Sequence, residues 1–145
     1  MTRSYEDLIA AFGAALGHPN LAPDERGTCA FTVDDDATVF IQQRDDDTVL
    51  VFAEVGRLPS DAAARELLAA NLFGQGAAGG NIGLAPDTGL VIMSRQEPLR
   101  GLDHTEFAAI LEVFLDLLGH WRAALPNLGA AEATVAVDGA AGVRV

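Results

Sequence analysis

A glycine-dense run is the first place in this chain where residue types and spacing could do chemistry. The residues Gly74-Gln75-Gly76-Ala77-Ala78-Gly79 match the G-x-G-x-x-G pattern with which dinucleotide-binding folds hold a pyrophosphate. That pattern works where it follows a strand and opens a helix, because the phosphate binds at the helix N-terminus. Here a helical stretch precedes the run and a strand-like stretch follows it, so the order is reversed. We therefore expect a flexible joint rather than a nucleotide site.

Two aspartate triplets, Asp34-Asp35-Asp36 and Asp45-Asp46-Asp47, are the next candidates, because clustered carboxylates bind hard cations. Neither triplet has the alternating ligand spacing and the closing glutamate of a calcium-binding loop. Both stand between strand-like runs, where hairpin turns are needed. We interpret them as solvated turns and predict no metal site.

The histidines and the cysteine form no catalytic constellation. His18, His104 and His120 are far apart in sequence, without an i, i+4 partner, and Cys29 has no neighbouring histidine. Cys29 lies within an apolar run, which predicts a buried and unreactive thiol. We predict a protein that is not an enzyme, with no catalytic residue and no cofactor.

The charge balance narrows the classes of partner. The chain has 145 residues and a formal net charge of −12, and all nine of its cationic side chains are arginine. Such an acidic surface repels phosphate backbones, so nucleic acid is not an expected partner. The same charge keeps a protein soluble while it displays apolar surface to a client. The polar first residues are unlike a signal peptide, and no apolar run is long enough for a bilayer, so we expect a cytoplasmic protein without membrane contact.

Hydrophobic periodicity predicts the elements that must position any site. A helix is expected over Ser4–Leu16, ended by Gly17. Three strands are expected over Thr28–Val33, Thr38–Gln42 and Thr48–Val55, and the short turns between them indicate an antiparallel meander. The third run is almost continuously apolar, which favours a central strand covered on both faces.

The second half is predicted to contain a helix, a hairpin and a further helix. Ser60 is a good N-cap for a helix over Ala62–Phe73. A hairpin is expected from Asn81–Ala85 and Leu90–Arg95, followed by a long amphipathic helix from Asp103 to Pro126.

This order of elements predicts an α+β fold: a five-stranded antiparallel sheet packed with three helices in the order α-β-β-β-α-β-β-α. We expect one domain over residues 1–125 and a flexible, alanine- and glycine-rich tail over residues 126–145.

The residues around the glycine run also resemble a known family. Ala70-Asn71-Leu72-Phe73-Gly74, then Gly79-Gly80, Gly83 and Thr88-Gly89 are similar to the segment that joins the second helix to the last two strands in class I type III secretion chaperones. The final helix carries Trp121 near its end, as is frequent in that family. The resemblance covers roughly residues 4–125, and it implies the same fold and a bacterial cytoplasmic protein that holds a secreted effector.

The resemblance also implies two sets of site residues. The first would form a homodimer through the second helix and the following strand, and its members are Leu67, Leu68, Asn71, Leu72, Phe73, Ile82 and Leu84. The second would bind the N-terminal segment of the effector in extended form, and its members are Leu8, Ile9, Phe12, Leu16, Phe31, Val33, Val39 and Ile41. Periodicity does not separate residues of the second set that face the core from residues that face a client. The secretion ATPase is a further candidate partner.

Two alternatives stay open at the level of sequence. One is an α+β protein-interaction adaptor outside secretion that uses the same sheet edge. The other is a small-ligand or nucleotide-binding domain centred on Gly74–Gly80.

Overall fold

The computed structural model of the chain describes residues 2–33 and 37–129, and the side chains from residue 5 onward. Its elements follow the predicted order, with two short 3₁₀ helices, η1 and η2, added to the helices and strands. They are α1 (Thr2–Leu16), β1 (Thr28–Val33), β2 (Ala37–Asp45), β3 (Thr48–Arg57), α2 (Asp61–Ala70), η1 (Leu72–Ala77), β4 (Asn81–Ala85), β5 (Leu90–Pro98), α3 (His104–Ala124) and η2 (Leu125–Asn127).

The five strands form one antiparallel sheet in the order β1-β2-β3-β5-β4. Strands that follow one another in sequence pair in β1–β2, β2–β3 and β4–β5, and β5 also pairs with β3. The predicted α+β fold class is therefore confirmed. β1 and β4 are the two edges of the sheet, a position that leaves one side of each strand without a strand neighbour.

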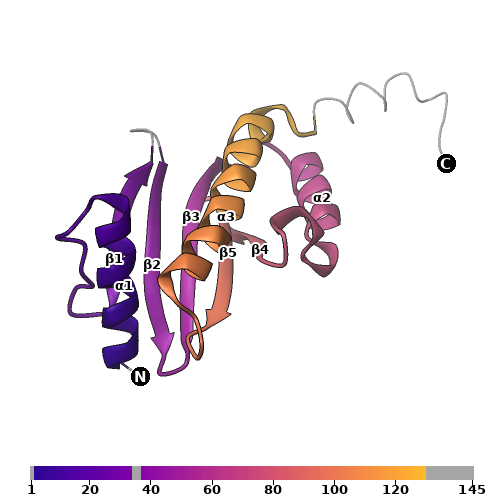
Figure 1. Ribbon diagram of the computed structural model, residues 1–145. Helices are drawn as coiled ribbons and strands as arrows, with labels where there is room; N and C mark the ends of the chain where they lie inside the picture. The colour runs from indigo at the N-terminus through magenta and orange to yellow at the C-terminus, as the bar shows by residue number, and fades with distance from the viewer. Residues whose placement is uncertain (1, 34–36, 130–145) are drawn as a thin grey trace, which may run out of the picture.

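Figure 1 shows α1 and α3 on the same face of the sheet, with α2 beside β4 at the far end. Alternate strand residues, such as Val39, Val51 and Met93, point to this face and are fully buried under the helices. The long apolar stripe of α3 supplies Phe107, Leu111, Phe114 and Leu118 to the same core.

Local signals in the sequence fix where the helices begin. The Ser60 hydroxyl accepts a hydrogen bond from the Ala63 N–H, so it caps α2 as predicted. Asp103 caps α3 in a complete capping box, since Asp103 Oδ1 accepts from the Glu106 N–H and Glu106 Oε1 accepts from the Asp103 N–H.

Two details of the predicted elements are wrong. The second helix ends at Ala70 instead of Phe73, and the chain continues as η1. The third strand is central, yet only one of its faces is covered. Leu50 and Phe52 stay partly exposed on the other face, where the Phe52 ring stacks on Phe40 with ring centroids 5.1 Å apart. The continuous apolar run of β3 therefore supplies one face to the core and, on the other face, the partly exposed Leu50 and the stacked Phe52.

The described residues extend four positions past residue 125, where the predicted domain ends. Leu125 is buried, and the Gly129 N–H donates to Glu66 Oε2 on α2. The close approach explains the glycine, because a Cβ there would lie 2.7 Å from Ser60 Oγ. The rest of the predicted tail, residues 130–145, lies outside the described residues.

Candidate functional site

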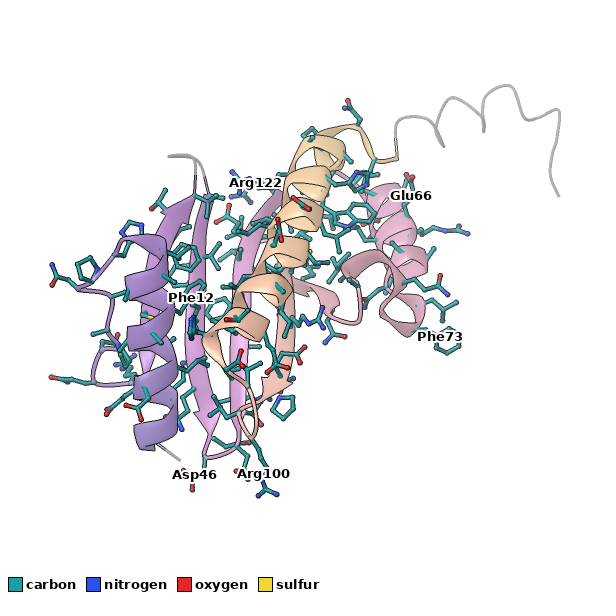
Figure 2. The ribbon with its side chains drawn as sticks, viewed as in Figure 1. Phe12, Asp46, Glu66, Phe73, Arg100 and Arg122 are labelled. Carbon is teal, nitrogen blue, oxygen red and sulfur yellow. The ribbon has the colours of Figure 1, made fainter. Side chains whose placement is uncertain are left out.

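An open groove lies between the end of α1 and the middle of α3, over the end of β1. Its volume is about 390 Å³. At its base Phe12 packs edge to face on Phe31, with ring centroids 6.0 Å apart, and on Phe107, at 5.0 Å. Figure 2 shows Phe12 on the side of α1 that faces the sheet and α3. The lining residues of this α1–α3 groove are Phe12, Leu16, His18, Phe31, Thr32, Val33, Ala108, Leu111, Glu112 and Leu115.

The eight residues predicted to bind an effector divide into two groups. Leu8, Ile9, Phe12, Val39 and Ile41 are buried in the core, and of these five only Phe12 also lines the groove, at its floor. The helical and strand periods that singled them out are the same periods that face a residue toward its own core.

The other three, Leu16, Phe31 and Val33, line the groove and stay accessible. Leu16 is the most open, with 45% of its side chain exposed. For these three an effector-binding role stays a prediction. Sequence reasoning missed the α3 wall of the groove, because nothing local to Leu111 or Leu115 shows that these residues face an opening beside α1.

The edge strand β1 runs along one side of this groove. The Thr28 N–H donates to Asp24 Oδ1 at 3.0 Å, and the Thr28 carbonyl oxygen accepts from the Asp24 N–H at 2.8 Å. The polar backbone groups of Thr28 therefore point away from β2. Ala30 and Thr32 have the same orientation, because strand residues alternate. Within the described residues their outward N–H and C=O groups have no partner. The edge can therefore accept an added strand.

Cys29 and Tyr5 fill the space between β1 and α1. The Tyr5 hydroxyl donates to the carbonyl oxygens of Gly27, at 2.7 Å, and Ile41, at 3.2 Å. Burial raises the pKa of the Cys29 thiol to about 11, and burial also raises the pKa of the Tyr5 hydroxyl. The thiol is buried as predicted, and its protonated form makes it a poor nucleophile at neutral pH.

A second apolar surface lies at the other end of the molecule, between α2 and the edge strand β4. A groove of about 200 Å³ runs through it, lined by Leu58, Ala64, Leu67, Leu68, Ile82, Gly83, Leu84 and Val91. We call these residues, together with the neighbouring Leu72 and Phe73, the α2–β4 surface. None of the residues that line the groove is charged.

Phe73 protrudes from the α2–β4 surface in a strained backbone conformation. Its side chain is 87% exposed, and Figure 2 shows it pointing away from the body of the molecule. Its φ is 57°, a left-handed value that is unusual for a bulky residue. Asn71 prepares the turn, since its side-chain oxygen accepts from the Ile82 N–H at 2.9 Å. This side-chain bond joins the end of α2 to the start of β4.

Two long side chains hold the rest of the turn. Trp121 Nε1 donates to the Gly76 carbonyl oxygen at 2.8 Å, and Arg95 Nη1 donates to that of Ala78 at 2.8 Å. The glycine run is therefore an anchored loop, where the sequence predicted a flexible joint. Its motif predicted the break in the helix, whereas the Trp121 contact bridges 45 positions of sequence and had no local signal.

The seven residues predicted to form a dimer interface also divide. Leu68, Leu72, Phe73 and Leu84 are exposed, whereas Leu67 and Ile82 are buried against the chain's own sheet. Asn71 is partly exposed and serves the turn. The four exposed residues lie together, and for them the role in a dimer stays a prediction.

The remaining candidates for chemistry do not assemble in the described part of the chain. The glycine run follows α2 and leads into β4, the reverse of the order that a dinucleotide site needs. No group of three His, Cys, Asp or Glu side chains among the described residues could hold a metal ion. The first aspartate triplet, residues 34–36, lies outside those residues, and Asp46 and Asp47 form the predicted turn. Of the described helices, none is both long and apolar enough to cross a membrane.

The comparison with protein families decides the affiliation. Residues 7–122 match the Tir chaperone protein (CesT) family. This chain belongs to that family. The match spans both apolar surfaces described above. A comparison with curated protein sequences finds no match.

Solved structures of similar fold include complexes of chaperones with their partners. The chain is 25% identical to a chain of the ExsC–ExsE complex, with a TM-score of 0.76, and the match covers 87% of this chain and 96% of the other. It is 22% identical to a chain of the HopA1–SchA chaperone–effector complex, with a TM-score of 0.73 and coverage of 83% and 94%. It is 21% identical to a chain of the complex of the type III secretion chaperone SycH from Yersinia pestis with a fragment of YscM2, with a TM-score of 0.68 and coverage of 81% and 98%.

Proposed function

We propose that this protein is a type III secretion chaperone. It binds the N-terminal region of a cognate effector in the bacterial cytoplasm and keeps that region soluble, non-globular and ready for secretion. The observation that carries the proposal is the family match over residues 7–122, on a chain whose α1–α3 groove is open beside an unpaired strand edge.

The geometry supports capture of an extended segment. Ala30 and Thr32 offer backbone hydrogen bonds along β1, and the groove beside them offers apolar pockets to alternate side chains of an added strand. Backbone pairing provides affinity without regard to sequence, and the pockets provide the choice of side chain. Ordering a disordered segment costs entropy, which burial of apolar area of the order of 1,000 Å² or more must offset.

Binding of this kind requires no catalytic step, no nucleotide and no metal. The net charge of −12 opposes aggregation while the grooves are open. The secretion ATPase is a candidate receiver of the loaded chaperone.

We also propose that two copies associate through the α2–β4 surface. Leu68, Phe73 and Leu84 expose apolar area there with no charge in the groove between them, so contact at this place brings two acidic chains together with the least repulsion. A two-fold interface uses the same patch on both copies, which a single continuous surface can supply.

The test of the proposed function is co-expression with large proteins encoded beside the chain, followed by affinity purification and sizing of the complex. We expect a soluble complex with the N-terminal region of one of them. Leu16→Asp should abolish the complex, because it places a carboxylate in the groove.

Val113→Asp is the matched control, because Val113 is 44% exposed on α3 and does not line the groove. Equal loss of the complex in both variants, or full capture by Leu16→Asp, would contradict the proposed site.

A further inference from the structure

The α1–α3 groove is the central part of a longer trough. At one end it meets a hollow beside the β1 edge, and both are lined by His18, Phe31 and Thr32. At the other end it meets a hollow along α3, and both of these are lined by Val33 and Leu115. A segment that adds to β1 therefore has a continuous path round the end of α1 to α3.

The α3 wall of this trough carries negative charge. Glu112 lines the groove and Asp116 lines the next hollow. They are four residues apart, so they stand one above the other on the same face of the helix. Both side chains are exposed, and within the described residues neither has an ion-pair partner. The same hollow is also lined by Arg122, whose Nη1 donates to the Glu54 carbonyl oxygen at 2.8 Å.

These charges constrain what can occupy the trough. An apolar side chain fits the pocket of Phe12, Phe31 and Leu111, which Glu112 also lines. A segment that continues into the adjoining hollow along α3 also passes Asp116. An aspartate or glutamate at that place would be repelled by them and by the net charge of −12. A lysine or arginine would be attracted, and the apolar stem of its side chain could lie along the groove wall.

We propose that this trough selects segments in which apolar anchors are accompanied by a lysine or arginine, and that Glu112 and Asp116 are the residues that recognise the cation. The inference rests on the proposed function and names the chemistry of the captured segment. The apolar pocket supplies most of the affinity, and the carboxylates set preference among apolar segments.

The size of the effect follows from the exposure of the carboxylates. Exposed ion pairs contribute modestly, so removal of one carboxylate should weaken binding of a cationic peptide by about two- to fivefold at low salt. Salt should weaken the binding too, because it screens exposed charges. Binding of the uncharged counterpart of the same peptide should not change.

The test is selection of displayed random peptides on the full chain and on the double variant E112Q/D116N. The matched control is the double variant E25Q/D87N, which removes equal charge at exposed positions outside the trough. We expect the wild type and the control to enrich apolar peptides that contain lysine or arginine. The double variant in the trough should enrich apolar peptides without that preference.

The outcomes separate this inference from the proposed function. Enrichment of apolar peptides with equal cation content in all three proteins overturns the role of Glu112 and Asp116 and leaves capture in the groove intact. Loss of the cation preference in E25Q/D87N overturns it as well, since net charge alone would then be responsible. If Leu16→Asp retains the selected peptides at wild-type affinity, the groove is not the binding site, and both proposals fail.

Discussion

The two apolar surfaces of this protein differ in how far their largest side chains are exposed to solvent. In the α1–α3 groove, Phe12 and Leu111 are buried beneath a rim formed by residues such as Leu16. On the α2–β4 surface, Leu68 and Phe73 protrude, with 71% and 87% of their side chains exposed. A groove that keeps its apolar floor covered can stand empty in water at little cost. A surface that protrudes needs lasting cover, which suits association of two copies.

The largest expected effect tests whether the floor of the groove is part of the core. Phe12→Ala should lower the free energy of unfolding by about 3–5 kcal/mol, because it removes a buried ring that packs on two others. Urea titration followed by circular dichroism measures the change. Leu16→Ala, at the exposed rim, should cost less than about 1 kcal/mol. Similar costs for the two variants would remove the distinction between floor and rim.

The next effect concerns the protruding surface. Leu68→Asp should raise the dissociation constant of the dimer about thirtyfold or more, the loss typical of a central apolar contact. Sedimentation equilibrium measures the constant, and unchanged circular dichroism shows that the chain stays folded. Val113→Asp adds the same charge on α3 and should leave association as it is. A wild type that is monomeric at all accessible concentrations would refute the proposed homodimer.

The smallest effect concerns the anchor of the strained loop. Trp121→Phe keeps an aromatic ring but loses the donor to the Gly76 carbonyl, so stability should fall by about 1 kcal/mol. The loop amides of Gly79 and Gly80, which donate to Gly74 and Ala77, should exchange with solvent faster. Hydrogen exchange measured by NMR gives the rates. Unchanged exchange would mean that the loop keeps its form without Trp121.

Most of the fold followed from patterns that operate over a few residues. The caps at Ser60 and Asp103 and the turn at Pro86–Gly89 placed the elements, and their order predicted the sheet. The end of α2 was misplaced because Leu72 continues an alanine- and leucine-rich stretch, a composition that favours a helix. The turn itself comes at Phe73 and Gly74, which have positive φ, and the bond between Asn71 and Ile82 is one of the distant contacts that hold it.

The candidate sites were harder to predict, because exposure is a property of packing between distant elements. Ile9 and Leu16 belong to the same apolar stripe of α1. Ile9 is fully buried in the core, whereas Leu16, at the end of the helix, is exposed. Likewise Leu67 and Leu68 are neighbours in sequence, and only Leu68 faces solvent. The resemblance named two regions, and the arrangement of the three helices decides which of their residues are accessible.

The bond from Trp121 to Gly76 has a consequence for biosynthesis. Its donor lies near the end of α3, 45 positions after its acceptor, so the bond cannot form until α3 has been synthesised. Until then the turn that carries Phe73 lacks one of its two long side-chain anchors. If two copies pair through the α2–β4 surface as proposed, nascent chains would present the complete contact surface only once α3 has been made and has docked.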